Sequence, residues 1–212
     1  MNRSFDMHVI LNELAKDRPV FHSEADFQFA LAWKIQLLYL DASIRLEYNP
    51  QVFKSRTYID IWIRFPSGQN IAIELKYKTK EMKLQHHGET YELARHGAPA
   101  NNRFLIVQDI GRLQHVVKHV PNTLGYAVIV TNDNEYWQEW RIPKETKDRA
   151  FRVHEGAFLS GELKWKEDTA KSTIRSLGES LYLDGGYRMK WFDYSTSTGT
   201  IFKFLVNKVT QM

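Results

Sequence analysis

The sequence of this 212-residue chain predicts an α/β fold with a mixed sheet, followed by a β-rich C-terminal extension. Three observations support this prediction. Apolar residues recur at helical spacing after Ser23 and again across residues 106–120. Two neighbouring segments, 58–65 and 70–78, alternate along their length as strands do. The nearly continuous apolar run within 124–133 suits a strand that is buried on both faces. The predicted order is helix, three strands, helix, strand.

Two helices are predicted at the start of the chain. Residues 5–15 suit a short helix with three apolar positions, Val9, Leu11 and Leu14. Ser23 has the side chain of a helix N-cap, and Asp26, three residues later, replaces the usual glutamate of a capping box. The apolar stripe of the second helix is Phe27, Leu31, Ile35 and Leu38.

Three strands are predicted next, at residues 43–48, 58–65 and 70–78. The turn at 66–69 has the proline and glycine that favour a hairpin loop. One face of the second strand presents Ile59, Ile61, Ile63 and Phe65, and one face of the third presents Ile71, Ile73, Leu75 and Tyr77. These two strands therefore pair with their apolar faces on the same side.

The rest of the chain is less regular. Residues 81–100 give no pattern that can be assigned, and a second long helix follows, ending at Pro121. The apolar stripe of that helix is Ile106, Ile110, Leu113, Val117 and Val120. From Ala150 we expect short strands, with turns at 183–186 and 195–199. Residues 166–173 suggest a polar loop.

We therefore expect a core over residues 1–149 and an extension over 150–212 that packs on it as part of one compact unit. With no cysteine, the chain has neither disulfides nor thiolate sites, which is compatible with a reducing compartment. No signal peptide or membrane span is predicted, so we expect a cytoplasmic location and no membrane partner. The net charge of +4 is a weak indication of a polyanionic partner.

Three ionisable residues stand inside the two paired strands. Asp60 lies within the second strand, and Glu74 and Lys76 lie two apart on the third, so their side chains share a face. Matching the apolar faces requires paired residue numbers with an even sum, such as Asp60 with Glu74 or with Lys76. The same parity places Asp60 on the face of Glu74 and Lys76. Burying the isoleucines therefore gathers the three charges.

Glu24 falls on the inward stripe of the first long helix, whereas Asp26 lies on the opposite side. It is either a first-turn acid that complements the helix dipole or a third carboxylate of the cluster. Converging carboxylates repel one another unless a cation holds them, and hard oxygen ligands suit Mg²⁺ or Mn²⁺. Such a metal activates water and stabilises a phosphoryl transition state. Lys76 beside it could orient or deprotonate water, or neutralise developing charge.

The arrangement Asp60…Glu74-Leu75-Lys76, preceded by helical Glu24, resembles the PD-(D/E)XK nuclease superfamily, and so does the order of elements over residues 23–133. The resemblance implies a restriction-endonuclease-like core and a metal-dependent endonuclease that hydrolyses phosphodiester bonds of DNA. It implies metal ligands at Asp60, Glu74 and the Leu75 backbone carbonyl. It also implies Lys76 as the catalytic lysine and Glu24 as an accessory acid. Ile59 replaces the proline of the name-giving motif.

Other charged residues allow two interpretations. Lys78, Lys80 and Arg112 are candidates for nucleic-acid contacts, and both lysines could equally be solvated. For Arg112 with Asp109 the default interpretation is a surface ion pair at i, i+3, and a buried or site-facing pair is the alternative. Basic residues flank Trp165 and Trp191, a pattern of nucleic-acid surfaces and, more often, of core tryptophans beside exposed lysines.

Two functional hypotheses follow. The first is a DNA nuclease in which alanine at Asp60, Glu74 or Lys76 abolishes cleavage and leaves the fold intact. Two cuts in a duplex need two sites, which makes a homodimer plausible. The second is a catalytically inactive module that binds nucleic acid or a protein partner on the same fold. The retention of Lys76 among the acids argues for the first.

Overall fold

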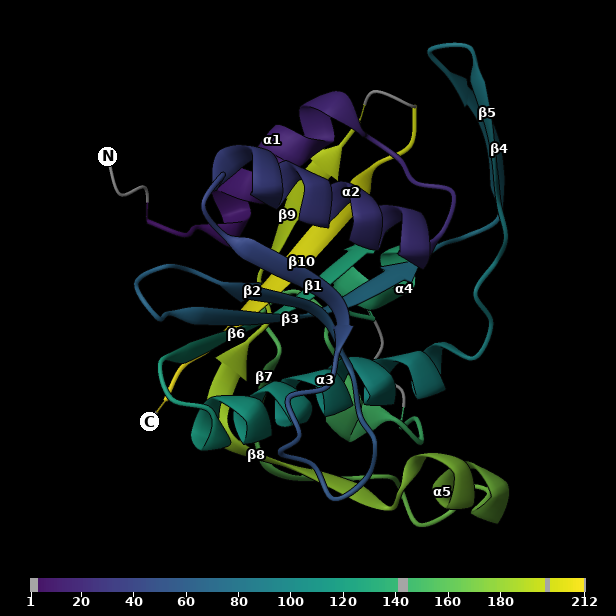
Figure 1. The fold of residues 1–212 in the computed structure, drawn as a ribbon. Helices are drawn as coiled ribbons and strands as arrows, with labels where there is room; N and C mark the ends of the chain where they lie inside the picture. The colour runs from purple at the N-terminus through teal and green to yellow at the C-terminus, as the bar shows by residue number, and fades with distance from the viewer. Residues whose placement is uncertain (1–3, 141–144, 197–198, 212) are drawn as a thin grey trace.

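The computed structural model describes residues 4–140, 145–196 and 199–211, which form a mixed α/β fold around a six-stranded sheet (Figure 1). The sheet has the order β1-β2-β3-β6-β10-β9. Its strands are β1 Ser43–Tyr48, β2 Ile59–Arg64, β3 Asn70–Lys78, β6 Thr123–Thr131, β9 Trp191–Ser195 and β10 Phe202–Val209. The helices are α1 Met7–Asp17, α2 Glu24–Leu38, α3 Pro99–His119, α4 Asn134–Trp137 and α5 Lys171–Leu177, with a short 3₁₀ helix, η1, at Arg149–Phe151.

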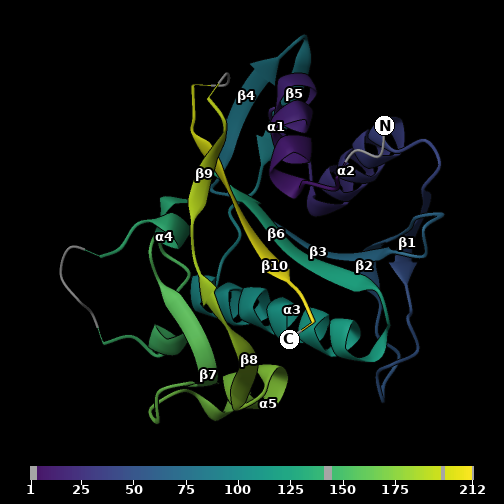
Figure 2. The same ribbon diagram turned by 90° about the vertical axis from the view of Figure 1, so that its left-hand side faces the viewer.

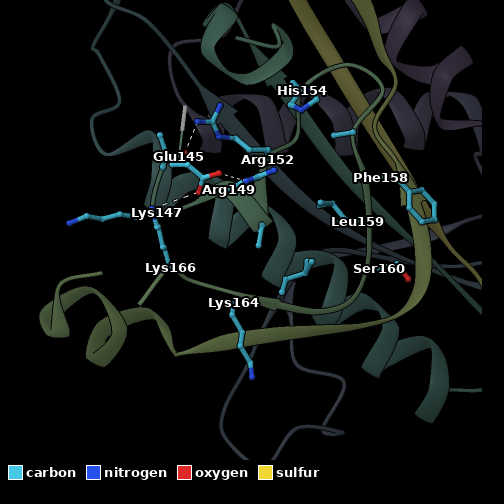
Figure 3. Close-up of a pocket in the computed structure, with 14 residues that line it drawn as sticks. Glu145, Lys147, Arg149, Arg152, His154, Phe158, Leu159, Ser160, Lys164 and Lys166 are labelled. Atoms are coloured by element: carbon cyan, nitrogen blue, oxygen red, sulfur yellow. Dashed lines mark hydrogen bonds and ion pairs between the residues drawn. The ribbon is translucent and has the colours of Figure 1, made fainter. Parts of the chain in front are cut away.

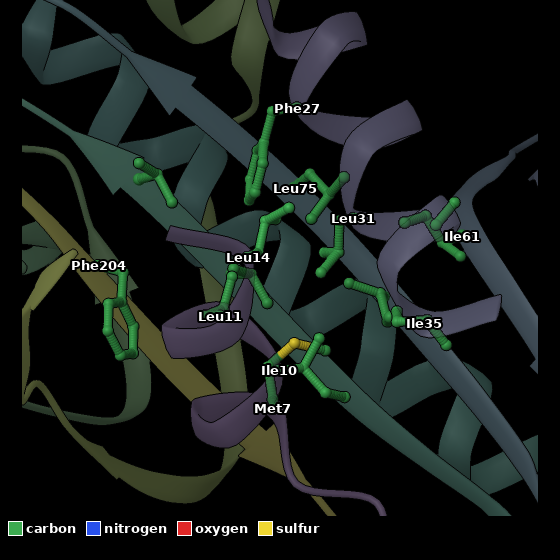
Figure 4. Packing of buried hydrophobic residues seen from close by; sticks show 14 of the residues in the cluster. Met7, Ile10, Leu11, Leu14, Phe27, Leu31, Ile35, Ile61, Leu75 and Phe204 are labelled. Atoms are coloured by element: carbon green, nitrogen blue, oxygen red, sulfur yellow. The ribbon is translucent and has the colours of Figure 1, made fainter. Parts of the chain in front are cut away.

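The sheet separates two hydrophobic cores. Helices α1 and α2 cover one face, and α3 covers the other (Figure 2). Figure 4 shows the first core, where Leu11 and Leu14 of α1 and Leu31 of α2 pack towards Leu75 of β3. On the opposite face, α3 packs against the sheet through Ile110 and its neighbours. A residue of β3 therefore points to α1 and α2 when its number is odd, and to α3 when it is even.

The predicted helix start at Ser23 is confirmed. Its hydroxyl accepts a hydrogen bond from Asp26 N–H at 3.1 Å. The Asp26 carboxylate does not complete the capping box at Ser23. It accepts from His22 N–H at 3.0 Å and forms a bidentate pair with Arg18 at 2.8 Å. The loop before α2 is thereby fixed by an acid from the first turn of the helix.

The predicted even parity of the hairpin register is also confirmed. Strand β2 pairs antiparallel with β3, with Ile61 opposite Ile73 and Ile63 opposite Ile71, so paired numbers sum to 134. These isoleucines lie in the first core, as the alternation predicts. Ile59 is an exception. It lies beyond the last pair of β2 with β3 and packs in the second core with Trp62.

The C-terminal strands extend the central sheet itself. Strand β10 pairs antiparallel with β6, and β9 adds the next strand. Two smaller two-stranded sheets stand apart from it: β4 Met82–His86 with β5 Glu89–Leu93, and β7 Phe158–Lys164 with β8 Ser180–Arg188. The first of these hairpins occupies most of the region that the sequence left unassigned, and it projects from the body of the molecule (Figure 1).

Two expectations for the extension are wrong. Residues 183–186 lie inside β8 and form no turn: the register with β7 shifts between Leu159 and Gly161, and the two glycines lie in this irregular part of the strand, where Gly186 is next to the ring of Phe158. A Cβ atom at Gly186 would lie 2.4 Å from Phe158 Cζ. The polar loop at 166–173 ends early, since α5 begins at Lys171. The turn predicted at 195–199 includes residues 197 and 198, which lie outside the described residues.

Gly125 sets the distance between α3 and the sheet. A Cβ atom there would lie 3.0 Å from Leu113 Cβ and 3.1 Å from Val209 Cβ. We expect Gly125→Ala to lower the free energy of unfolding by about 1–3 kcal/mol, the usual cost of overpacking a core. Denaturant unfolding measures this change. Gly111→Ala is the control, because a Cβ atom at Gly111 meets nothing within 4 Å. Equal stability of both variants would contradict the close approach.

Within the described residues, no helix combines the length and the apolar character that crossing a membrane requires.

Candidate functional site

Strands β2 and β3 separate at one end of their pairing, and acidic side chains occupy the gap. The β2–β3 ladder ends at Ile61 and Ile73, whereas β3 stays paired with β6 as far as Lys78. On the edge that β2 leaves, Leu75 N–H donates to Asp60 Oδ2 at 2.6 Å. Two residues on, Tyr77 N–H donates to Glu24 Oε2 at 2.7 Å. Two of the predicted acids thus replace ladder partners of β3.

Glu74 and Lys76 point to the opposite core and meet α3. The Lys76 ammonium lies 2.7 Å from Asp109 Oδ2 and donates to the Leu75 carbonyl at 2.9 Å. Arg112 Nη2 lies 3.0 Å from Glu74 Oε1, and Arg112 Nη1 lies 3.4 Å from Asp109 Oδ1. Asp60, Glu74 and Lys76 are therefore gathered on the α3 side of the sheet, together with two residues of α3.

Asp109 corrects the interpretation of a surface ion pair. Its side chain is 6% exposed and its first partner is Lys76, not Arg112. The one sequence signal was its position beside the apolar stripe of the helix, next to Ile110. Arg112, a candidate for nucleic-acid contact, is occupied by Glu74, Asp109 and the Tyr58 carbonyl. It acts at this point as a counterion of the acids.

Burial sets the protonation of the cluster. Burial raises the pKa of Glu74 well above its usual range, and the charges of Asp109 and Asp60 raise it further. Burial also raises the pKa of Asp60, only partly offset by the hydrogen bond from Leu75. The pKa of Asp109 is raised by burial against the attraction of Lys76. Three carboxylates with raised pKa values in one place are typical of functional sites.

The pKa of Lys76 is also raised, which for a lysine favours the charged form. Burial alone would lower its pKa, but the adjacent Asp109 carboxylate outweighs burial and raises the pKa above its ordinary value. Lys76 is therefore an ammonium ion at neutral pH. It brings a fixed positive charge to the cluster.

The Glu74 carboxyl is buried and has two close contacts. Arg112 Nη2 lies 3.0 Å from its Oε1, and it shares a hydrogen bond with the Asp60 carboxyl. Two carboxylates in contact in a buried site repel each other, and a cation would relieve that cost. Among the described residues, no three His, Asp or Glu side chains are grouped as a ready metal site. The predicted ligand set needs only two side chains, Asp60 and Glu74, because the third ligand is the Leu75 carbonyl. That oxygen has a second lone pair beside the one that Lys76 uses.

The remaining predicted residues lie at the end of β3. Lys78 Nζ lies 3.1 Å from Glu24 Oε2. Lys80 Nζ lies 3.3 Å from Asp133 Oδ1 and also donates to Asn134. Glu24 is partly exposed and joins α2 to β3, so it lies at the border of the cluster and not at its centre.

A hollow of 580 Å³ opens beside the cluster. Asp60 and Arg112 line one side of it, and Phe53, Arg56 and Tyr58 of the loop before β2 are among its other lining residues. The guanidinium of Arg56 lies 5.3 Å from the ring centre of Tyr58. The hollow thus combines acidic side chains, two arginines and aromatic rings.

A second hollow of 530 Å³ lies beside η1 and β7, and basic residues outnumber acidic ones in its lining (Figure 3). Five cations and a single carboxylate, that of Glu145, are among its lining residues. The cations are Lys147, Arg149, Arg152, Lys164 and Lys166. Four of them form ion pairs: Arg149 and Lys166 with Glu145, Arg152 with Asp148, and Lys164 with Glu162.

Trp165 and Trp191 are both 7% exposed, which confirms them as core tryptophans flanked by exposed basic residues.

Comparisons with protein-family models, with curated proteins and with solved structures give no match for this chain. Function must therefore be inferred from the geometry of the side chains.

Proposed function

We propose that this chain is a divalent-metal-dependent deoxyribonuclease, acting as an endonuclease, on a PD-(D/E)XK, restriction-endonuclease-like core. One observation carries the proposal. Asp60, Glu74 and Lys76 gather where β2 and β3 separate, and the buried Glu74 carboxyl meets the Asp60 carboxyl there. The order α2, β1, β2, β3, α3, β6 supports the same core, with the β4–β5 hairpin inserted before α3.

Asp60, Glu74 and the Leu75 carbonyl would hold the metal. Their donor set consists only of oxygen atoms, which suits Mg²⁺ or Mn²⁺ and not softer metals. When bound, such an ion supplies Lewis-acid stabilisation of the charge that develops on a phosphoryl group. The chain itself keeps the ligands in place, since Leu75 N–H fixes Asp60 and Gln28 of α2 donates to the Asp60 carbonyl at 2.8 Å.

Lys76 acts as a cation in this proposal. Its raised pKa argues against a role as a general base and favours two roles that need the charged form. It orients the attacking water as a hydrogen-bond donor and neutralises charge on the phosphate oxygens. Asp109 is a positioning residue, because it holds the ammonium at 2.7 Å and keeps it protonated. Glu24 positions the end of β3 through Tyr77.

The hollow beside Asp60 offers a place for the substrate strand. Arg56 can pair with a phosphate, and Phe53 and Tyr58 offer rings for contact with a base or sugar. The basic hollow near η1 supplies a further surface for a phosphate backbone (Figure 3). Both features support DNA as the partner, in addition to the acidic cluster.

The basic hollow leads to a prediction about binding. Replacing Lys147, Lys164 and Lys166 together with alanine should weaken DNA binding at low salt. It should also reduce the slope of log K against log salt by about 2–3, since each phosphate contact contributes about 0.9. Fluorescence anisotropy with labelled duplex in EDTA measures binding without cleavage. A variant with alanine at Lys16, Lys118 and Lys208 is the control. An equal loss of DNA affinity in this control would show that binding depends only on the total charge of the chain.

An inactive binding module on the same fold is the alternative. The buried ion pair between Lys76 and Asp109 argues against it, since a surface used only for binding has no need of a charged lysine among buried acids. A nuclease needs the metal and Lys76 for cleavage, whereas a binding module would bind nucleic acid without either and cleave nothing.

Cleavage of supercoiled plasmid and of single-stranded DNA in Mg²⁺ or Mn²⁺ tests the proposal. We expect nicking or linearisation that is lost in EDTA and in the Lys76→Ala variant. Binding without cleavage, indifferent to metal, would replace the nuclease with the binding module.

A further inference from the structure

The outer side of α2 presents a row of exposed apolar side chains. Phe29 is 63% exposed, Trp33 70%, Leu37 56% and Leu40 81%. Their spacing of four, four and three residues places them along one side of the helix and the turn that follows it. These four make up half of the large hydrophobic side chains that are exposed in the described part of the chain. We call them the α2 stripe.

The α2 stripe is not part of either core. The opposite side of the helix, with Phe27, Leu31 and Ile35, already packs on the sheet. In Figures 1 and 2, no helix or strand of the described chain lies over the outer side of α2. A continuous apolar row of this kind on a single helix is typical of an interface, whereas single exposed apolar residues need no explanation.

We propose that the α2 stripe is the interface of a homodimer, in which α2 pairs antiparallel with α2 of a second copy. A two-fold axis near Trp33 sets Phe29 opposite the partner's Leu37, and the same contact is repeated on the other side of the axis. Antiparallel pairing also opposes the two helix dipoles. The stripe is therefore complementary to itself.

The exposed area suits a second copy. With roughly 150–250 Å² for a whole aromatic side chain, the stripe exposes on the order of 500 Å² per copy. A symmetric pair would bury on the order of 1000 Å², which is about the lower limit for a specific interface.

The absence of charge on the stripe also favours a second copy of the same apolar stripe over a charged partner. No side chain of the α2 stripe is ionisable. Lys34, the nearest charge at its middle, has a side chain only 16% exposed and forms an ion pair with Asp17 of α1. Pairing two stripes therefore brings together side chains that carry no charge, and burying an unpaired charge would be costly.

The interface helix also touches the candidate active site. Its inner side contributes Gln28 and Glu24, which bind the backbone of Asp60 and Tyr77. If the proposed nuclease function holds, a dimer brings two sites to one duplex, one for each strand. The existence of the dimer does not depend on that function.

Sedimentation velocity of the whole chain at micromolar concentrations tests the interface. We expect the wild type to sediment as a dimer, and Trp33→Glu to dissociate at least about 30-fold more readily, as loss of a hot-spot residue does. Leu37→Glu should have the same effect. Because both side chains are more than half exposed, neither change should lower the melting temperature of the monomer.

Phe158→Glu is the matched control, since Phe158 is 58% exposed on β7 and lies outside the stripe. It should leave the dimer unchanged. A wild-type monomer over the whole concentration range would overturn the proposal. So would a dimer that survives both α2 variants, or one that is lost equally in the control. Mass is measured independently of cleavage, so an inactive dimer would contradict the nuclease and not the interface.

Discussion

Replacing Glu74 with glutamine should abolish cleavage and at the same time stabilise the metal-free fold. The substitution keeps the shape of the side chain but removes its charge, and with it the ability to hold a divalent cation. We expect a loss of about 10³-fold or more in rate, the scale of removing one strong electrostatic contact to a transition state. Plasmid nicking under single-turnover conditions measures this loss.

The gain in stability follows from the sign of the pKa shift. Glu74 has a higher pKa in the folded chain than the ordinary value of 4.5, so its ionised form opposes folding. The wild type in EDTA should therefore lose stability as the pH rises from 4.5 through the raised pKa. Glu74→Gln should lose less over the same window. Above that window we expect it to be about 1 kcal/mol more stable, or roughly 2–4 °C in melting temperature.

The matched control for Glu74→Gln is Glu92→Gln, an exposed strand glutamate on β5 that pairs with Lys83. It should change neither the rate nor the response of stability to pH in that window. A Glu74→Gln variant that still cleaves would remove Glu74 from the site. A variant that unfolds more readily would show that the contact with Arg112 outweighs the burial of the charge.

Replacing Lys76 with alanine should also abolish cleavage, but at a cost to stability that the sequence alone does not predict. The substitution leaves Asp109 buried with only the longer contact to Arg112, at 3.4 Å. Breaking a buried ion pair in this way costs about 3–5 kcal/mol. We expect a rate loss of at least about 10³-fold and a clearly lower midpoint of urea unfolding.

A double variant separates the two effects. In Lys76→Ala with Asp109→Asn, the charge that the loss of Lys76 leaves unpaired at position 109 is removed, so most of the lost stability should return while cleavage stays absent. Lys78→Ala is the control for stability, since its pair with the partly exposed Glu24 should contribute about 1 kcal/mol or less. Cleavage by the double variant would show that Lys76 stabilises the fold and takes no part in the reaction.

Much of the candidate site could be predicted because its rules are local. Strand alternation has a period of two, so burying Ile61 and Ile73 leaves Asp60, Glu74 and Lys76 on one face. The N-cap at Ser23 and the stripe of α3 likewise depend on residues a few positions apart. The order of elements up to β6 follows from such patterns, and only the β4–β5 hairpin interrupts it.

The sequence by itself determined the parity of the pairing between β2 and β3, and with it the gathering of three charges on one face, because only an even sum of paired numbers buries the isoleucines together. The structure selected one register of that parity. Only the tertiary structure decided which residues of α3 complete the cluster. The rotation of α3 over the sheet depends on packing against Gly125 and its neighbours, and that rotation turns Asp109 inward to Lys76. The addition of β9 and β10 to the central sheet was likewise a tertiary outcome, since strand pairing between distant segments leaves no local periodicity in a sequence.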